Sequence, residues 1–147
     1  MKLLVNHLPY QRAASLYIRF SVFVIERNIK MEEEFDDNDE QDTIYAVLYD
    51  GKQPVSTGRF LPETQTEARL TRIATLKGYR GNGYGTKIII ALENYAKENG
   101  YHYLTIHAEL TAKDFYQTLG YQAIGNIYME DGESCQTLEK YLILRRH

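Results

Sequence analysis

The chain has 147 residues, of which 44% are hydrophobic and 25% are charged, so we expect a single domain over residues 1–147 that buries its own core. Its net charge of −3 and its single cysteine, Cys135, argue against a nucleic-acid-binding protein, an internal disulfide and a cysteine-clustered zinc site. No apolar run approaches the roughly 20 residues of a membrane span and the N-terminal segment MKLLVNHLPY is no signal peptide, so we expect a cytoplasmic protein that binds no membrane.

The first half of the chain predicts a strand, a helix and then three strands. Residues 2–5 are strand-like, and Asn6 and Pro9 then supply an Asx-type cap and a proline at a helix start. Apolar residues continue this helix at helical spacing: Leu16, Phe20, Phe23 and Val24. Residues 43–61 hold two β-rich runs around Asp50-Gly51, which predicts a hairpin, and residues 67–76 add a third strand.

The second half predicts two helices that alternate with strands. An amphipathic helix is indicated by apolar residues at i, i+3, i+4, i+7 and i+8, namely Ile88, Ala91, Leu92, Tyr95 and Ala96, and it stops at Asn99-Gly100. Residues 101–108 predict a strand, 111–120 a short helix, and 121–130 and 136–145 two strands joined through Asp131-Gly132. The fold class is therefore mixed α/β (α+β), with helices flanking a sheet in the order β-α-β-β-β-α-β-α-β-β.

An acidic segment, MEEEFDDNDEQD, places eight carboxylates between Glu32 and Asp42. A calcium loop is disfavoured because the required glycine does not follow Asp37-Asn38-Asp39-Glu40, and we expect no metal. We interpret the segment as a solvated loop. The alternative is a rim that attracts an amine.

A glycine-rich loop, YRGNGYGTK, lies directly before the amphipathic helix and has glycine at 81, 83 and 85. A strand, a glycine loop and a helix start together make an anion site, because the first N–H groups of a helix lack internal partners. A Walker phosphate loop requires Gly-Lys-Ser/Thr, but here Thr86 precedes Lys87. The dinucleotide-binding motif G-x-G-x-x-G is also absent, because the third glycine comes one residue early. What remains is Arg80-x-x-Gly83-x-Gly85, unless the glycines only form a tight turn.

This pattern resembles the R/Q-x-x-G-x-G/A motif with which the GNAT acyltransferase superfamily holds the pyrophosphate of acetyl-CoA. The segments RIATL (72–76) and FYQTLGY (115–121) resemble the family's neighbouring motifs at the matching intervals. VFVIERN (22–28), HAE (107–109) and EDG (130–132) are similar to the ElaA-like and YjcF-like branch. That branch usually has Gln where Glu109 stands and His where Cys135 stands.

The resemblance implies a GNAT-like, mostly antiparallel, twisted sheet and a set of residues that bind acetyl-CoA as co-substrate. Ile73 and Thr75 would take part through backbone groups of the strand, as would the glycine loop. The implied donor-binding residues are Ile73, Ala74, Thr75, Arg80, Gly81, Asn82, Gly83, Tyr84, Gly85 and Thr86. Cys135 itself is interpreted as a small buried hydrophobe.

The implied reaction is direct attack of an amine on the thioester in a ternary complex, with CoA leaving as a thiolate. An amine like that of lysine is mostly protonated near neutral pH, and deprotonation costs roughly 4 kcal/mol. The candidates for the base or relay are Glu26, His107 and Glu109. The alternatives are that Glu26 is a surface helix residue and that His107 is a strand residue whose hydrogen bonds are satisfied within the fold. Tyr116 is the candidate for stabilising the departing thiolate, against the alternative of a core aromatic.

Two functions from different classes follow from these residues. The first is an acetyl-CoA-dependent N-acetyltransferase that acts on a primary amine of a small molecule or peptide. The second is an acyl-CoA-binding regulatory module that has lost turnover. The sequence does not identify the acceptor and leaves open whether the chain forms a homodimer.

Overall fold

The computed structural model describes residues 1–143 as an alternation of strands and helices. The strands are β1 (Lys2–Asn6), β2 (Ile44–Asp50), β3 (Gln53–Pro62), β4 (Glu67–Thr75), β5 (Tyr103–Glu109), β6 (Gln122–Glu130) and β7 (Glu133–Tyr141). The helices are α1 (Pro9–Arg19), α2 (Met31–Glu34), α3 (Tyr84–Glu98) and α4 (Lys113–Thr118), with a π-helical segment at Phe20–Glu26. This order confirms the predicted mixed fold class.

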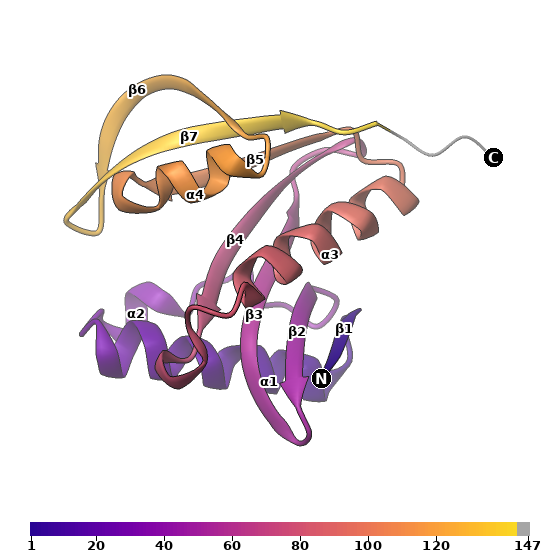
Figure 1. The fold of residues 1–147 in the computed structure, drawn as a ribbon, viewed down its shortest axis with the longest axis vertical. Helices are drawn as coiled ribbons and strands as arrows, with labels where there is room; N and C mark the ends of the chain where they lie inside the picture. The colour runs from indigo at the N-terminus through magenta and orange to yellow at the C-terminus, as the bar shows by residue number, and fades with distance from the viewer. Residues whose placement is uncertain (144–147) are drawn as a thin grey trace.

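The strands form one seven-stranded sheet in the order β1-β2-β3-β4-β5-β7-β6. Every neighbouring pair is antiparallel except β4 and β5, which run parallel. Figure 1 shows β5, β6 and β7 as an upper group that separates from β2, β3 and β4. The parallel pair is therefore the seam between the two groups.

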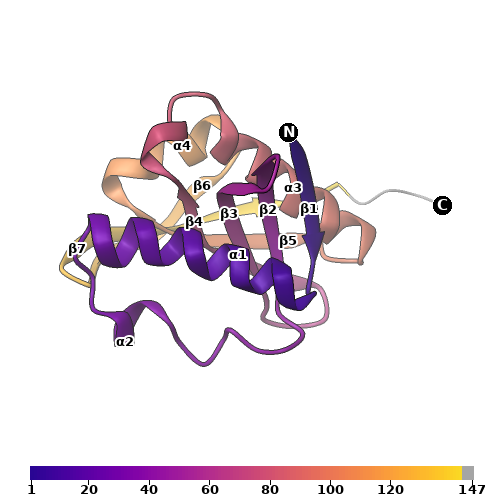
Figure 2. The same cartoon turned by 90° about the horizontal axis from the view of Figure 1, so that it is seen from below.

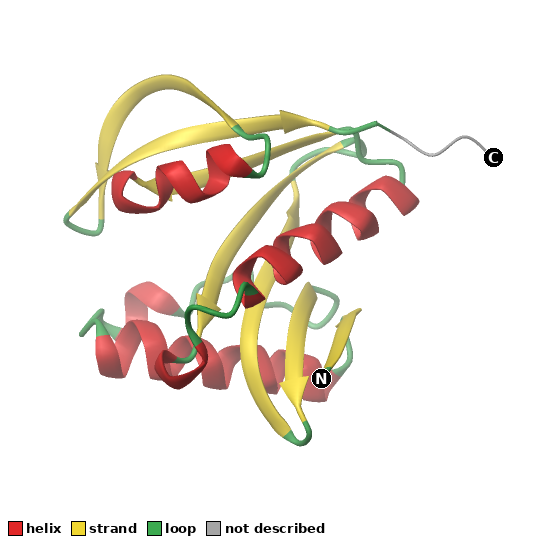
Figure 3. Cartoon of the chain, in the orientation of Figure 1, coloured by secondary structure: helices red, strands yellow, loops and turns green. Residues whose placement is uncertain are grey.

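Helices cover both faces of the sheet. Helix α1 contacts β2, β3 and β4 and lies across one face of the sheet, with α3 and α4 on the other (Figure 2). The coloured cartoon in Figure 3 shows the same layering, with short green loops between most elements. Strand β2 is buried on both faces, since Tyr45 and Val47 join the core beside α1 while Ala46 and Leu48 join the core beside α3. A strand between two helical layers needs apolar residues at successive positions rather than alternating ones.

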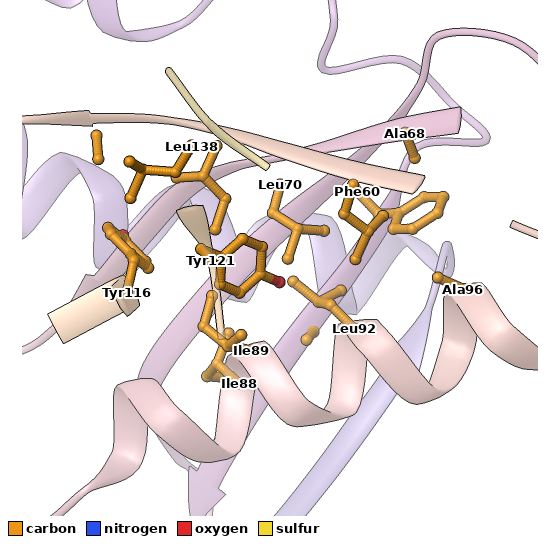
Figure 4. Close-up of a cluster of buried hydrophobic side chains, with 14 of the residues drawn as sticks. Phe60, Ala68, Leu70, Ile88, Ile89, Leu92, Ala96, Tyr116, Tyr121 and Leu138 are labelled. Carbon is orange, nitrogen blue, oxygen red and sulfur yellow. The ribbon is translucent and has the colours of Figure 1, made fainter. Parts of the chain in front are cut away.

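The larger core packs α3 and α4 against the sheet. Ile88, Ile89 and Leu92 of α3 are fully buried and point toward Leu70 and Tyr121 in Figure 4. The Tyr121 hydroxyl donates a 2.7 Å hydrogen bond to the buried carboxylate of Glu93, which also accepts from Lys140 at 3.0 Å. This arrangement gives the buried Tyr121 hydroxyl and the Glu93 carboxylate hydrogen-bond partners inside the core.

A β-bulge in β4 bends the strand away from β5. Thr57 pairs with Ala74 and Arg59 with Thr71, so two residues of β4 lie opposite the single Gly58. One of those two, Arg72, has a positive φ of 54°, which costs a non-glycine residue roughly 1–2 kcal/mol. An added Cβ at Gly58 would lie 2.7 Å from the Ile73 side chain, so glycine is required there. Pairing of β4 with β5 ends at Leu70, directly before the bulge.

The interpretation of the acidic segment as a solvated loop is wrong for three of its carboxylates. Glu34 is buried and lies 2.9 Å from Arg19 and 3.2 Å from Arg72. Asp39 contacts Arg19 at 2.7 Å, and Asp36 contacts Arg59 at 2.8 Å. These ion pairs attach the segment to α1, β3 and the bulge of β4, because each arginine comes from one of those elements.

Three local features differ from the sequence expectations. The helical spacing after Arg19 continues as a π-helix and not as an α-helix, and α2 is an additional short helix within the acidic segment. The last strand begins earlier and ends earlier than predicted, at Glu133–Tyr141, and the predicted residues 144 and 145 lie outside the described part of the chain. In the described part, no helix is long and apolar enough to span a membrane.

We predict that Asp39→Asn destabilises the protein in a pH-dependent way. Burial opposes ionisation of Asp39, but hydrogen bonds and the charge of Arg19 outweigh it and lower the pKa from 3.8 to about 2. A lowered carboxyl pKa stabilises the fold above the unfolded-state pKa and loses that effect as the pH falls from about 4 to about 2. Urea unfolding should give a loss of about 2–4 kcal/mol at neutral pH, shrinking across that acid range.

The matched control is Asp37→Asn, which makes the same charge change at an exposed position of the same segment. Its free energy of unfolding should stay within about 0.5 kcal/mol of wild type. Equal losses for both variants would show that the ion pairs of Asp39 do not stabilise the fold.

Candidate active site

A cavity of about 540 Å³ lies where β4 and β5 separate. Residues 70–73 of β4 and 106–109 of β5 line it, together with Phe23, Arg27 and Tyr116. Beyond Leu70 and Ile106 the two strands no longer pair. Backbone of residues 71–73 that faces the cavity therefore has no partner strand in β5 and can bond a ligand in the manner of an added strand.

Tyr116 enters the cavity from α4. The residue is only 8% exposed, and its ring packs edge-on against Phe115 at 5.1 Å and Tyr121 at 6.3 Å. No hydrogen bond to its hydroxyl is present within residues 1–143. Burial, and then the charge of Glu109, raise the pKa of Tyr116 to about 12. The hydroxyl is therefore a hydrogen-bond donor in the cavity that keeps its proton at neutral pH.

His107 and Glu109, two of the three candidates for the base, line the cavity from β5. Burial, and then the charge of Arg69, lower the pKa of His107 below 6.5, so its imidazole is neutral at pH 7 and can accept a proton. A guanidinium nitrogen of Arg69 lies 3.2 Å from its Nδ1. Glu109 instead forms an ion pair with Arg27 at 2.6 Å.

Glu26, the third candidate for the base, lies outside the cavity lining. Its carboxylate accepts two hydrogen bonds from Arg80, at 2.5 and 2.7 Å. The hydrogen bonds and charge of Arg80 lower the pKa of Glu26, which makes this carboxylate a weaker base than usual. The contacts favour an ion-pair role for Glu26 over proton acceptance.

The glycine loop forms the N-terminus of α3. Gly81 and Gly83 have φ values of +84° and +76°, and a Cβ at either would meet no atom within 4 Å. Gly85 lies in the first turn of the helix, where a Cβ would touch the Phe115 ring at 3.6 Å. The first N–H groups of α3 lack intrahelical partners, and Gly81 and Gly83 leave open space beside the loop that precedes them. This fits a phosphate-bearing ligand.

The remaining residues that were predicted to bind acetyl-CoA differ in their surroundings. Ile73 lines the cavity, whereas the buried Ala74 belongs to the core beside α1. The Thr75 carbonyl accepts from Arg80 Nε at 2.9 Å. With Nε on Thr75 and both terminal nitrogens on Glu26, the Arg80 guanidinium has a partner at each nitrogen. The Asn82 side chain donates to Tyr79 O at 3.1 Å, within the loop itself.

The two positions that depart from the branch pattern are neighbours in space. Glu109 of β5 pairs directly with Cys135 of β7, and both line the cavity. Cys135 is 3% exposed, as expected for a buried small residue, and burial raises the pKa of its thiol. No cluster of three or more potential metal ligands is present within residues 1–143.

Sequence reasoning missed Arg27 in the cavity wall. Its partner Glu109 is 82 residues away in the chain, so no local spacing joins them. Arg27 also follows the π-helical segment, whose wider turn changes the direction in which its side chain leaves the helix. The charge of Arg27 within VFVIERN was the one available signal.

Comparison with known proteins gives the family. Residues 12–142 match the acetyltransferase (GNAT) domain model. An acetyltransferase of Streptococcus pyogenes from the region 3′ of arcA is 58% identical over 113 residues, 77% of each chain. YyaT of Bacillus subtilis is 39% identical over 120 residues, 80% of each chain.

Solved structures agree with this fold. A Lactobacillus plantarum protein described as an N-acetyltransferase is 38% identical, with a TM-score of 0.93 over 97% of this chain and 98% of its own. Escherichia coli ElaA has a TM-score of 0.82 at 20% identity, over 93% of this chain and 97% of its own. The latter identity supports a shared fold alone.

We predict that Gly83→Ala weakens CoA binding at least about tenfold while the protein stays folded, because the added methyl group stands where the pyrophosphate must approach the loop. Isothermal titration calorimetry with CoA measures the change. Gly51→Ala is the matched control, since Gly51 also has a positive φ of +60° and open space around it but lies in the β2–β3 turn. Both variants carry the same backbone strain of roughly 1–2 kcal/mol, and only Gly83→Ala should lose affinity. Equal CoA affinities for the two would reduce Gly83 to a turn residue.

Proposed function

This chain belongs to the GNAT acetyltransferase family, and on that premise we propose that it transfers an acetyl group from acetyl-CoA to a primary amine of a small molecule or peptide. The observation that carries the proposal is the separation of β4 and β5 after Leu70 and Ile106. It leaves unpaired backbone of β4 beside a cavity that also holds the Tyr116 hydroxyl. The cytoplasmic location and the oligomeric state stay predictions.

The donor would lie along β4 and end at the glycine loop. Backbone groups at Ile73 and Thr75 would bond the pantetheine arm, and the N–H groups of residues 81–86 would hold the pyrophosphate. Each hydrogen bond to a charged phosphate contributes roughly 1.5–3 kcal/mol, against about 0.3–1 kcal/mol for the helix dipole. Converging N–H groups would therefore supply most of the affinity.

When bound, the donor supplies a thioester whose acyl carbon the neutral amine attacks directly. The residues of this chain then act on protons and charge. His107 is the best-suited proton acceptor of the three candidates, because its lowered pKa keeps it neutral at pH 7. Arg69 contacts the neutral imidazole of His107, whereas Glu26 and Glu109 are held in charged ion pairs with Arg80 and Arg27. A water-mediated path to His107 would deliver the proton without a covalent enzyme intermediate.

Tyr116 would stabilise the departing thiolate through a hydrogen bond. With the Tyr116 pKa at about 12 and a thiol pKa of roughly 8.5, complete proton transfer is uphill by about 5 kcal/mol. The hydroxyl therefore donates a hydrogen bond and keeps its proton. Its lack of a partner within the described residues leaves it free to do so.

The alternative role of the acidic segment, a rim that attracts an amine, would fall to only part of its carboxylates. Glu34 contacts Arg19 and Arg72 within the fold, so it is unavailable to an amine. Glu33 lines the cavity and is exposed. With Glu130 and Glu133, which also line the cavity, it would attract a cationic acceptor.

The competing function is an acyl-CoA-binding regulatory module without turnover. Acceptor-dependent release of free CoA thiol separates the two. Acetyl-CoA would be incubated with a panel of amines, polyamines, amino acids and peptides, and the thiol would be titrated. Turnover with an amine supports the enzyme, whereas tight CoA binding without acceptor-dependent thiol release would support the regulatory module.

We predict that Tyr116→Phe lowers kcat by roughly 10–100-fold and leaves CoA affinity unchanged, because it removes one hydroxyl and keeps the ring that packs against Phe115 and Tyr121. Single-turnover kinetics with a good acceptor measures the chemical step. Tyr95→Phe is the matched control, since it removes a hydroxyl on α3 away from the cavity lining. Turnover by Tyr116→Phe at the wild-type rate would make Tyr116 a packing residue only.

A further inference from the structure

Arg27 and Glu109 form an ion pair between two walls of the cavity. Arg27 follows the π-helical segment, and Glu109 is the last residue of β5. Arg27 Nη2 lies 2.6 Å from Glu109 Oε1, and the two side chains are 34% and 33% exposed. Such partly exposed pairs contribute little to stability, typically about 0–1 kcal/mol. Its place in the cavity is therefore more informative than its strength.

Local structure holds Arg27 in this position. Its backbone N–H donates to Val22 O at 3.1 Å, and Asn28 ends the helix with a φ of +58°. The guanidinium carbon lies 5.7 Å from the centre of the Phe23 ring. The preceding residue, Glu26, is bound to Arg80 at the far end of β4. The consecutive residues Glu26 and Arg27 therefore connect to the ends of β4 and β5, respectively.

Glu109 without Arg27 would leave an uncompensated negative charge in the cavity. Glu109 and Tyr116 line the same space, and the carboxylate already raises the pKa of Tyr116. The proposed reaction develops further negative charge there, on the thioester oxygen and then on the thiolate. A bare carboxylate would oppose both.

We propose that Arg27 is a positioning residue that holds Glu109 against the cavity wall and neutralises it, so that negative charge can develop beside Tyr116. This inference rests on the proposed acetyltransferase function. In this inference Glu109 is a neutralised charge. It acts neither as the base nor as a residue that binds the amine. The inference also predicts an unusual order of variants, in which loss of the arginine is more harmful than loss of its partner.

The test is a double-mutant cycle of Arg27→Gln, Glu109→Gln and the combination, at saturating acetyl-CoA. Arg27→Gln should lower kcat at least about tenfold, which is the effect expected of one bare charge roughly 12 Å away at an effective dielectric constant of about 20 and is exceeded at any shorter distance. Glu109→Gln should stay within about threefold of wild type, and the double variant should return to that level. Arg27→Lys keeps the charge and should retain most of the activity.

A second readout is independent of turnover. The pKa of the thiol of bound CoA can be titrated through its ultraviolet thiolate absorbance, with the CoA-free protein as the blank. It should rise by about one unit in Arg27→Gln and fall in Glu109→Gln. Arg12→Gln is the matched control, because it removes one arginine charge on α1 away from the cavity lining. This titration still tests the inference if no amine proves to be an acceptor, in which case only the proposed function fails.

Three outcomes would overturn the inference. Equal losses in both single variants with no recovery in the double variant would make the pair a purely structural link. The largest loss in Glu109→Gln, retained in the double variant, would make Glu109 the base. An equal shift of the thiol pKa in Arg12→Gln would reduce the effect of Arg27 to the total charge of the protein.

Discussion

The site depends on the bulge that turns β4 away from β5 at Arg72 and Ile73. A parallel pair would normally continue its ladder, and here it stops at Leu70 and Ile106. The unfavourable φ of Arg72 is held in place from two sides. Gly58 leaves room for Ile73, and Arg72 lies within 3.2–3.3 Å of Glu34 and Asp36. The acidic segment thus supports the geometry of the cavity, since its inward carboxylates fix the bulge.

A second constraint is the way the π-helical segment ends between the separated strands. Glu26 contacts Arg80, which also binds the last carbonyl of β4, while Arg27 contacts the end of β5. The two neighbouring residues therefore connect the glycine loop to the cavity beside Tyr116.

Much of this could be predicted from the sequence, because its signals are local. The glycine alternation before α3, the hairpin at Asp50-Gly51 and the spacing of Ile88, Leu92 and Ala96 each reflect a single turn or helix face. Glu34 and Arg27 could not be placed in this way. Their partners Arg19, Arg72 and Glu109 lie 15, 38 and 82 residues distant in the printed sequence. From composition alone a charged run is predicted to be solvated. Only the tertiary fold shows which of its charged side chains are buried.

The most direct test of this account is the set of backbone amide chemical shifts on addition of CoA. We expect the largest changes at Ile73, in the glycine loop at residues 81–86 and in α4 around Tyr116. The edge strand β1, at the other end of the sheet from β6, should remain unchanged. CoA binding that perturbs β1 and leaves the glycine loop and Ile73 unchanged would contradict the assignment of the acetyl-CoA site to the separation of β4 and β5.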